Sequence, residues 1–269
     1  MPNIFATDAA HPNSNRVQAA IAKAAEKTGV DFNYLLGQAR IESGLNPNAQ
    51  ARTSSASGLY QFTKQTWLAT VKAHGAEHGL DQAADAISQD TDGEYHVSDP
   101  SLRTDILNMR FAPEASSAMA AEFASDNSDY LANELGRTPE QVDLYLAHFL
   151  GVAGAARFLK HYDSDPGGAA AAILPKAAAA NAGIFYRANG TPRSFAEIRQ
   201  RFAAKLAGSV SPSATAPTTA SYAQVHGTPP SPQEFPPMLS IEPMPARLSL
   251  DFARAAYSKL AAMQGTGAV

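Results

Sequence analysis

Apolar side chains recur at three- and four-residue intervals through most of the first 207 residues, a spacing that predicts helices. In residues 16–28 the apolar positions fall on one helical face, and Gly29 is well placed to end that helix. Asp31 is a good N-cap for the next helix, "FNYLLGQARIES", and Gly44 and Pro47 stop it. The chain therefore begins its folded part with two consecutive helices.

Helical patterns continue as far as residue 208. Thr138 and Pro139 predict the start of one helix, and Ser194 is the expected cap of the last one. The stretch "DTDGEYHVSDP" predicts a polar loop, and we find no strand pair and no fixed-period repeat. The predicted fold class is all-α, with helices at residues 63–78, 101–112, 113–135, 138–151, 152–162, 169–181 and 194–208.

The composition changes after Gly208. Residues 208–243 are rich in Pro, Ser and Thr, which predicts an extended, poorly ordered linker. Residues 244–269 can form a short amphipathic helix, which would be marginal alone in water and is expected to dock on the domain or on a partner. We thus expect a flexible N-terminus at 1–15, one helical domain at 16–207, a linker and a helical tail.

Composition and charge exclude several kinds of protein. The 269-residue chain has a formal net charge of -4, which argues against a nucleic-acid binder held by phosphate contacts. It has no cysteine, so disulfides, thiolate metal sites and cysteine nucleophiles are excluded. No apolar run is long enough to span a bilayer, and "MPNIFATDAAHPNSNR" does not resemble a conventional signal peptide.

Glu42 is the strongest candidate for chemistry. Leu35, Ala39 and Glu42 are spaced so that the carboxylate lies on or beside the buried face of its helix. Burial and the negative end of the helix dipole would both favour its protonated form. Residues 43–62 contain no other acid. A solvent-facing helix end is the alternative interpretation of this residue, so its position alone does not decide between the two.

The residues around Glu42 resemble a known family. "ES" at a helix end, a small polar loop and then "SGLYQFTKQTW" are similar to the lytic transglycosylase domain of the soluble-lytic-transglycosylase type. Glu42-Ser43 matches the family's first element, and its second is matched by Ala56, Gly58, Leu59, Gln61 and Thr66. Ser55, Tyr60 and Lys64 depart from it, standing where the family has Gly, Met and Pro, but no proton-transfer group is lost.

The family's third element, Ala-Tyr-Asn-x-Gly on a later helix, has its best counterpart in "AHFLG", residues 147–151. His148 then takes the place of the family's Tyr, which lies close to the catalytic acid. A histidine there would bond the same carboxylate or the sugar. Tyr145, one turn earlier, is the other candidate for a phenol at this place. A core histidine between Leu144 and Val152 is the structural alternative.

The resemblance implies a lysozyme-like fold and cleavage of peptidoglycan without a cofactor. Glu42 would protonate the oxygen between N-acetylmuramic acid (MurNAc) and N-acetylglucosamine (GlcNAc), then act as base while the MurNAc C6 hydroxyl attacks C1. One carboxylate is enough, because the product is a 1,6-anhydro sugar. The substrate-binding residues that we expect from the resemblance are Ser43, Ser57, Gly58, Tyr60, Gln61, Tyr145 and His148.

Two other functions stay open. A hydrolytic muramidase of the same fold needs a second carboxylate, for which Asp90, Asp92 and Glu94 are the candidates. A non-enzymatic wall-binding or scaffold protein needs none. The expected site of action is the periplasm or cell envelope, and the N-terminus predicts delivery by a flagellar or injection-type secretion machine or with a phage particle. The tail would then contact that assembly.

Two short motifs point weakly to metals. "HGAEH" has histidines at positions 74 and 78, the spacing of a helical zinc pair. We predict a solvated helix end instead, since Gly75 weakens the helix and no third ligand is evident. The loop from Asp90 superficially resembles a calcium loop, but its glycine and final acid are misplaced. No metal is expected at the active site.

Overall fold

The computed structural model describes residues 12–52 and 54–210. Within them the expected all-α class is confirmed, since helices make up almost all of the regular structure. Most of the predicted linker and the whole predicted terminal helix lie outside the described residues. No described helix is both long enough and apolar enough to cross a membrane.

The longer helices follow the predicted order along the chain. Their bounds are α1 (Pro12–Thr28), α2 (Phe32–Ser43), α3 (Lys64–His74), α5 (Pro100–Asn108), α6 (Pro113–Leu135), α7 (Gln141–Leu150), α8 (Val152–Ser164) and α12 (Phe195–Val210). The short elements are η1 (Gly75–His78), α4 (Asp81–Ala86), β1 (Ser88–Gln89), β2 (Tyr95–His96), η2 (Met109–Phe111), α9 (Ala170–Ile173), α10 (Pro175–Ala180) and α11 (Ala182–Phe185).

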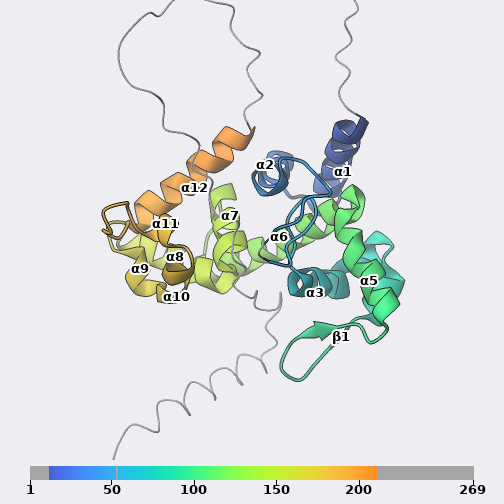
Figure 1. The fold of residues 1–269 in the computed structure, drawn as a ribbon. Coiled ribbons are helices and arrows are strands. Elements are labelled where there is room, and N and C mark those ends of the chain that lie inside the picture. The colour runs from blue at the N-terminus through green and yellow to red at the C-terminus, as the bar shows by residue number, and fades with distance from the viewer. Residues whose placement is uncertain (1–11, 53, 211–269) are drawn as a thin grey trace, which may run out of the picture.

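Helix α6 forms the centre of the fold. It runs through the middle of the molecule, and α1, α3, α7 and α8 pack against it (Figure 1). Helix α12 lies along α2 and also contacts α7, so the last described helix returns to the beginning of the domain. The predicted apolar faces of α1, α2 and α12 are buried in this core; they include Val17, Ile21, Leu35, Ala39, Phe195, Ile198, Phe202 and Leu206.

The ends of α2 agree with the sequence prediction. Asp31 accepts a hydrogen bond from the amide of Tyr34 at 2.9 Å and so caps the helix. Gly44 adopts the left-handed conformation at the other end, and its amide bonds back to the carbonyl of Arg40. Helix α12 starts with a capping box in which Ser194 and Glu197 bond each other's amides. These local signals set where the two helices begin and end.

The prediction for the start of α7 is wrong. The helix begins at Gln141 and its cap is Glu140, not Thr138. The reason is the fully buried side chain of Asp143, which accepts the amide of Glu140 at 3.1 Å and closes a capping box. Arg137 donates to the same carboxylate oxygen at 2.8 Å, so residues 137–140 are held outside the helix.

Three further predictions need correction. Residues 169–181 do not form one helix, because Pro175 starts a new short helix after the end of α9 at Ile173. The loop after Asp90 closes a small antiparallel hairpin, with Ser88 opposite His96 and Gln89 opposite Tyr95. The "HGAEH" segment is not a solvated helix end, since the side chains of His74 and His78 are largely buried against α6.

Candidate active site

Glu42 lies at the last turn of α2 with a side chain that is 7% exposed. The hydroxyl of Tyr145 donates to its Oε1 at 3.3 Å. The Nε2 atom of His148 lies 3.3 Å from the same oxygen. Because α7 carries both residues one turn apart, a single helix places a phenol and an imidazole on one side of the carboxylate. The other oxygen, Oε2, has neither of these contacts.

His148 is held on both sides. Its Nδ1 atom lies 3.1 Å from Nε2 of Gln38, a buried residue one turn before Glu42 on α2. Its ring stacks on the ring of Tyr145, with 6.0 Å between the ring centres and 10° between the planes. If the Gln38 amide donates to Nδ1, the proton of neutral His148 is on Nε2 and points at Glu42. The ring is therefore oriented toward the carboxylate.

Helix α12 closes the site from a third direction. The Nζ atom of Lys205 lies 3.4 Å from the Tyr145 hydroxyl and 5.8 Å from the centre of its ring. Burial lowers the pKa of Lys205, while the charge of Glu42 acts in the opposite sense. Burial, followed by the charge of Glu42, raises the pKa of Tyr145. Tyr145 thus stays a neutral donor to Glu42 while it accepts from a cation.

The loop after α2 is fixed to the end of that helix. The Ser43 hydroxyl lies 2.8 Å from the carbonyl of Leu59 and 3.0 Å from that of Ala39. Gly58 has a positive φ of 81°, and a Cβ there would lie 2.0 Å from the carbonyl oxygen of Arg110. The glycine is therefore needed for the loop to approach η2. The small-residue loop thus joins the end of α2 to η2.

Part of the chain matches the model of a known protein family. Residues 19–90 match the family model described as Transglycosylase SLT domain. The match supports a soluble-lytic-transglycosylase-type, lysozyme-like domain in this part of the chain. The match includes α2 with Glu42 and the whole loop to Thr66, which carried the predicted resemblance. Glycan cleavage of the lysozyme or lytic transglycosylase kind is the activity that this domain supports.

The matched segment ends before α6. Tyr145, His148 and Lys205 therefore lie outside it, and their connection to the SLT domain is structural. Arg40 of α2 donates to the carbonyl of Ser209 at 2.7 Å, which ties the end of α12 to the matched part. The residues that surround Glu42 come from segments more than a hundred positions apart.

Several residues predicted to bind substrate contribute to the framework of the segment that matches the SLT domain. Tyr60 is 1% exposed and belongs to the core, so it offers no face on which a sugar could stack. Phe62 is also buried and packs edge-on against Trp67. Both aromatic side chains of the loop are therefore core residues, whereas the sequence analysis assigned Tyr60 to substrate binding.

The polar residues of this loop bond the loop itself. Gln61 has a φ of 50° and its amide donates to the carbonyls of Gly58 at 2.9 Å and Ala49 at 3.2 Å. Ser57 is buried and pairs with Phe62 through the backbone. The hydroxyl of Ser43 is likewise directed to backbone carbonyls. These side chains hold the loop in shape and have no contact with Glu42 in the described structure.

Four residues that contribute to this site or to its loop were not among the predicted ones. Gln38 carries a usable signal, because it precedes Glu42 by one helical turn. Tyr34 lies on the same helix, and burial, then Tyr60 and then Glu42 raise its pKa. Arg110 donates to the carbonyls of Ser55 and Phe62 and has no local signal in the sequence. Lys205 is one of several basic residues on α12 and reaches the site only through tertiary packing.

The acids proposed for a muramidase mechanism belong to a different part of the molecule. Asp90 pairs with His96 at 3.2 Å, and Asp92 accepts the amide of Glu94 within the hairpin loop. The hairpin projects below α3, away from α2 and α7 (Figure 1). In this conformation the three carboxylates are not neighbours of Glu42.

Proposed function

We propose that this chain cleaves peptidoglycan strands between MurNAc and GlcNAc by lytic transglycosylation, with Glu42 as acid and base. The observation that carries the proposal is the environment of one carboxylate. Tyr145 and His148 both engage Oε1 of Glu42, and Oε2 is the oxygen that has no contact with either. A largely buried acid with one oxygen anchored is suited to exchange a proton at the other.

In the first step, protonated Glu42 gives its proton to the glycosidic oxygen. The bond from that oxygen to C1 of MurNAc breaks, and positive charge develops on the sugar ring. The new carboxylate is stabilised by hydrogen bonds from Tyr145 and from Nε2 of His148. The cation of Lys205 stabilises the same negative charge through the Tyr145 hydroxyl.

In the second step, Glu42 takes the proton of the MurNAc C6 hydroxyl while its oxygen bonds to C1. The product is a 1,6-anhydro-MurNAc end, and Glu42 is protonated again for the next cycle. No water is consumed, so no second carboxylate has to activate one. This mechanism fits a site in which the two groups that contact the acid are a phenol and an imidazole.

The test is mass spectrometry of purified sacculi after digestion by the full-length protein. We expect anhydro-MurNAc ends with wild type and none above background with Glu42→Gln. Glu26→Gln, an exposed glutamate on α1, is the matched control and should behave as wild type. Reducing MurNAc ends would establish a muramidase instead. Equal activity of wild type and Glu42→Gln would exclude Glu42 as the acid, and no activity in either would favour a wall-binding protein.

We also propose that the catalytic unit extends from α1 to α12, and that the chain after Val210 is a tether to a flagellar, secretion or phage assembly. The contacts of Lys205 and Ser209 support the first part, since α12 contributes to the site. A truncation after Val210 should keep its rate on purified sacculi and lose capture of the assembly proteins. If the truncated protein captures the assembly proteins as well as the full-length protein does, the chain after Val210 is not the tether.

A further inference from the structure

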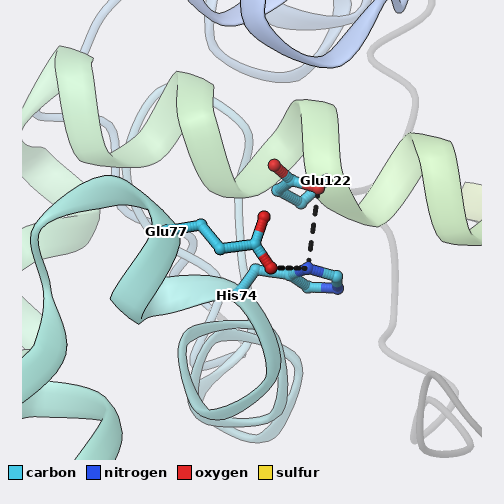
Figure 2. A group of neighbouring side chains, drawn as sticks. All are labelled: His74, Glu77 and Glu122. Atoms are coloured by element: carbon cyan, nitrogen blue, oxygen red, sulfur yellow. Dashed lines mark ion pairs between the residues drawn. The ribbon is translucent and has the colours of Figure 1, made fainter.

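A second polar cluster joins the end of α3 and η1 to the middle of α6. Figure 2 shows His74, Glu77 and Glu122 with their polar atoms directed toward a common point. One ligand atom from each lies within 4.8 Å of the other two. Asp126 and His78 contact the outside of this group. The proposed glycan chemistry uses none of these residues.

The spacing suits a small divalent cation. Nδ1 of His74 lies 3.5 Å from Oε2 of Glu122 and 4.0 Å from Oε1 of Glu77. Zinc binds nitrogen and oxygen at about 2.0–2.2 Å, so neighbouring ligand atoms in a tetrahedron stand about 3.3–3.6 Å apart. The His74–Glu122 pair already has this separation. The Glu77 side chain is 64% exposed, so it can move the short remaining distance without disturbing packing.

The hydrogen bond from His74 to Asp126 leaves the Nδ1 atom of His74 available to bind a metal. Nε2 lies 2.8 Å from Oδ2 of Asp126, an ionised carboxylate that can only accept, so the proton of a neutral ring is on Nε2. Nδ1 then presents its lone pair to Glu122 and Glu77. A ligand histidine whose other nitrogen donates to a carboxylate is the usual arrangement around protein-bound zinc.

Glu122 is oriented in the same manner. Nε2 of His78 lies 2.7 Å from its Oε1, which leaves Oε2 turned toward His74. The side chains of His74, His78, Glu122 and Asp126 are all largely buried. Lys27 donates to the backbone carbonyl of Glu77, which fixes η1 without using the carboxylate. Three acids thus face two imidazoles, and a divalent cation would offset much of the negative charge.

We propose that His74, Glu77 and Glu122 bind a divalent metal ion of the zinc class, with Asp126 and His78 orienting two of the ligands. Water completes the coordination. The spacing of the motif suggests His74 and His78 as a ligand pair, whereas in the structure His78 bonds Glu122 from outside the cluster. The ion would link η1 to α6 and so stabilise the half of the domain that carries α3.

The experiment uses the untagged, full-length protein after dialysis against a chelator, titrated with ZnCl₂ by calorimetry and by the shift in melting temperature. Wild type should take up one Zn²⁺ per chain and melt at a higher temperature with it. His74→Ala should abolish uptake, and Asp126→Asn should weaken it by about 10- to 100-fold.

Two variants keep the test decisive if a buried substitution unfolds the chain. Glu77→Gln changes an exposed ligand and should weaken Zn²⁺ binding at least about tenfold without lowering the melting temperature of the metal-free protein. His96→Ala removes the exposed pair with Asp90 and should bind as wild type. The proposal is overturned if wild type takes up no Zn²⁺, or if Glu77→Gln binds it as tightly as wild type.

Discussion

Two carboxylates that both connect to α7 have opposite surroundings. Asp143 is fully buried, and its two oxygens accept hydrogen bonds from Arg137, Arg199 and the amide of Glu140 at 2.8–3.1 Å. Glu42 has contacts of 3.3 Å to Tyr145 and His148, both on one oxygen. Asp143 and the partners of Glu42 all belong to α7.

The difference separates a structural acid from a reactive one. Two guanidinium groups and a backbone amide bond both oxygens of Asp143, so neither oxygen is left for a substrate. The partners of Glu42 can adjust to either protonation state, because a phenol and an imidazole can each donate or accept. Burial alone therefore does not identify a catalytic acid. The number and the charge of its hydrogen-bond partners do.

The largest expected effect is on the activity of Glu42→Gln. The amide keeps the shape of the side chain and cannot give a proton to the glycosidic oxygen, so the rate of anhydro-sugar release should fall by about 10³-fold or more. Its melting temperature should stay close to that of wild type. If Glu42→Gln unfolds the protein, the contrast with Asp143 is wrong, because Glu42 would then be a structural acid as well.

Asp143→Asn should show the converse behaviour. The amide leaves Arg137 and Arg199 without a buried anion, and the free energy of unfolding should fall by about 3 kcal/mol. Urea denaturation measures this change directly. At a temperature where the variant is folded, its kcat should stay within about threefold of wild type, because the ring positions of α7 are held by packing as well. A loss of kcat comparable to that of Glu42→Gln at that temperature would contradict the distinction.

The amphipathic helices could be predicted because their signals are local. Asp31 and Ser194 begin helices by accepting bonds from amides three residues later, and Gly44 ends one by donating its amide to carbonyls of the last turn. The start of α7 was not predicted, because Asp143, which closes the capping box with the amide of Glu140, is also held by Arg199, a residue 56 positions away. A Thr-Pro signal at 138–139 was overridden by that network.

The residues of the candidate site also differ in how far the sequence could predict them. Glu42 is suggested by its position on its helix, and Tyr145 and His148 by the resemblance to the family's third element; the structure brings the three side chains together. The sequence does not show whether the side chain of a loop residue points toward Glu42, into the core or back to its own loop. Tyr60 and Gln61 belong to the most recognisable motif of the SLT domain, yet one is in the core and the other bonds its own loop. Lys205 depends on the packing of α12 against α2.

A smaller effect is expected for Tyr145→Phe, which keeps the buried ring and removes the bond to Glu42. A hydrogen bond to a charged group contributes about 1.5–3 kcal/mol, and this one is long, so kcat should fall by about tenfold. His148 contacts the same oxygen. The double variant with His148→Phe should therefore lose more than the product of the two single losses. Strictly multiplicative losses would show that the two partners act independently.

Lys205→Met tests the weakest of these contacts, because the cation reaches Glu42 through the Tyr145 hydroxyl at 3.4 Å. Partly exposed charge interactions contribute about 0.2–1 kcal/mol, so kcat should fall by about 1.4- to fivefold. The effect should shrink as salt is added, whereas the loss in Tyr145→Phe should not depend on salt. Lys205→Arg keeps the charge and should restore most of the rate. If Lys205→Arg is as slow as Lys205→Met, the position of the ammonium group matters more than its charge, and Lys205 would resemble the tightly bonded arginines of Asp143 rather than a distant cation.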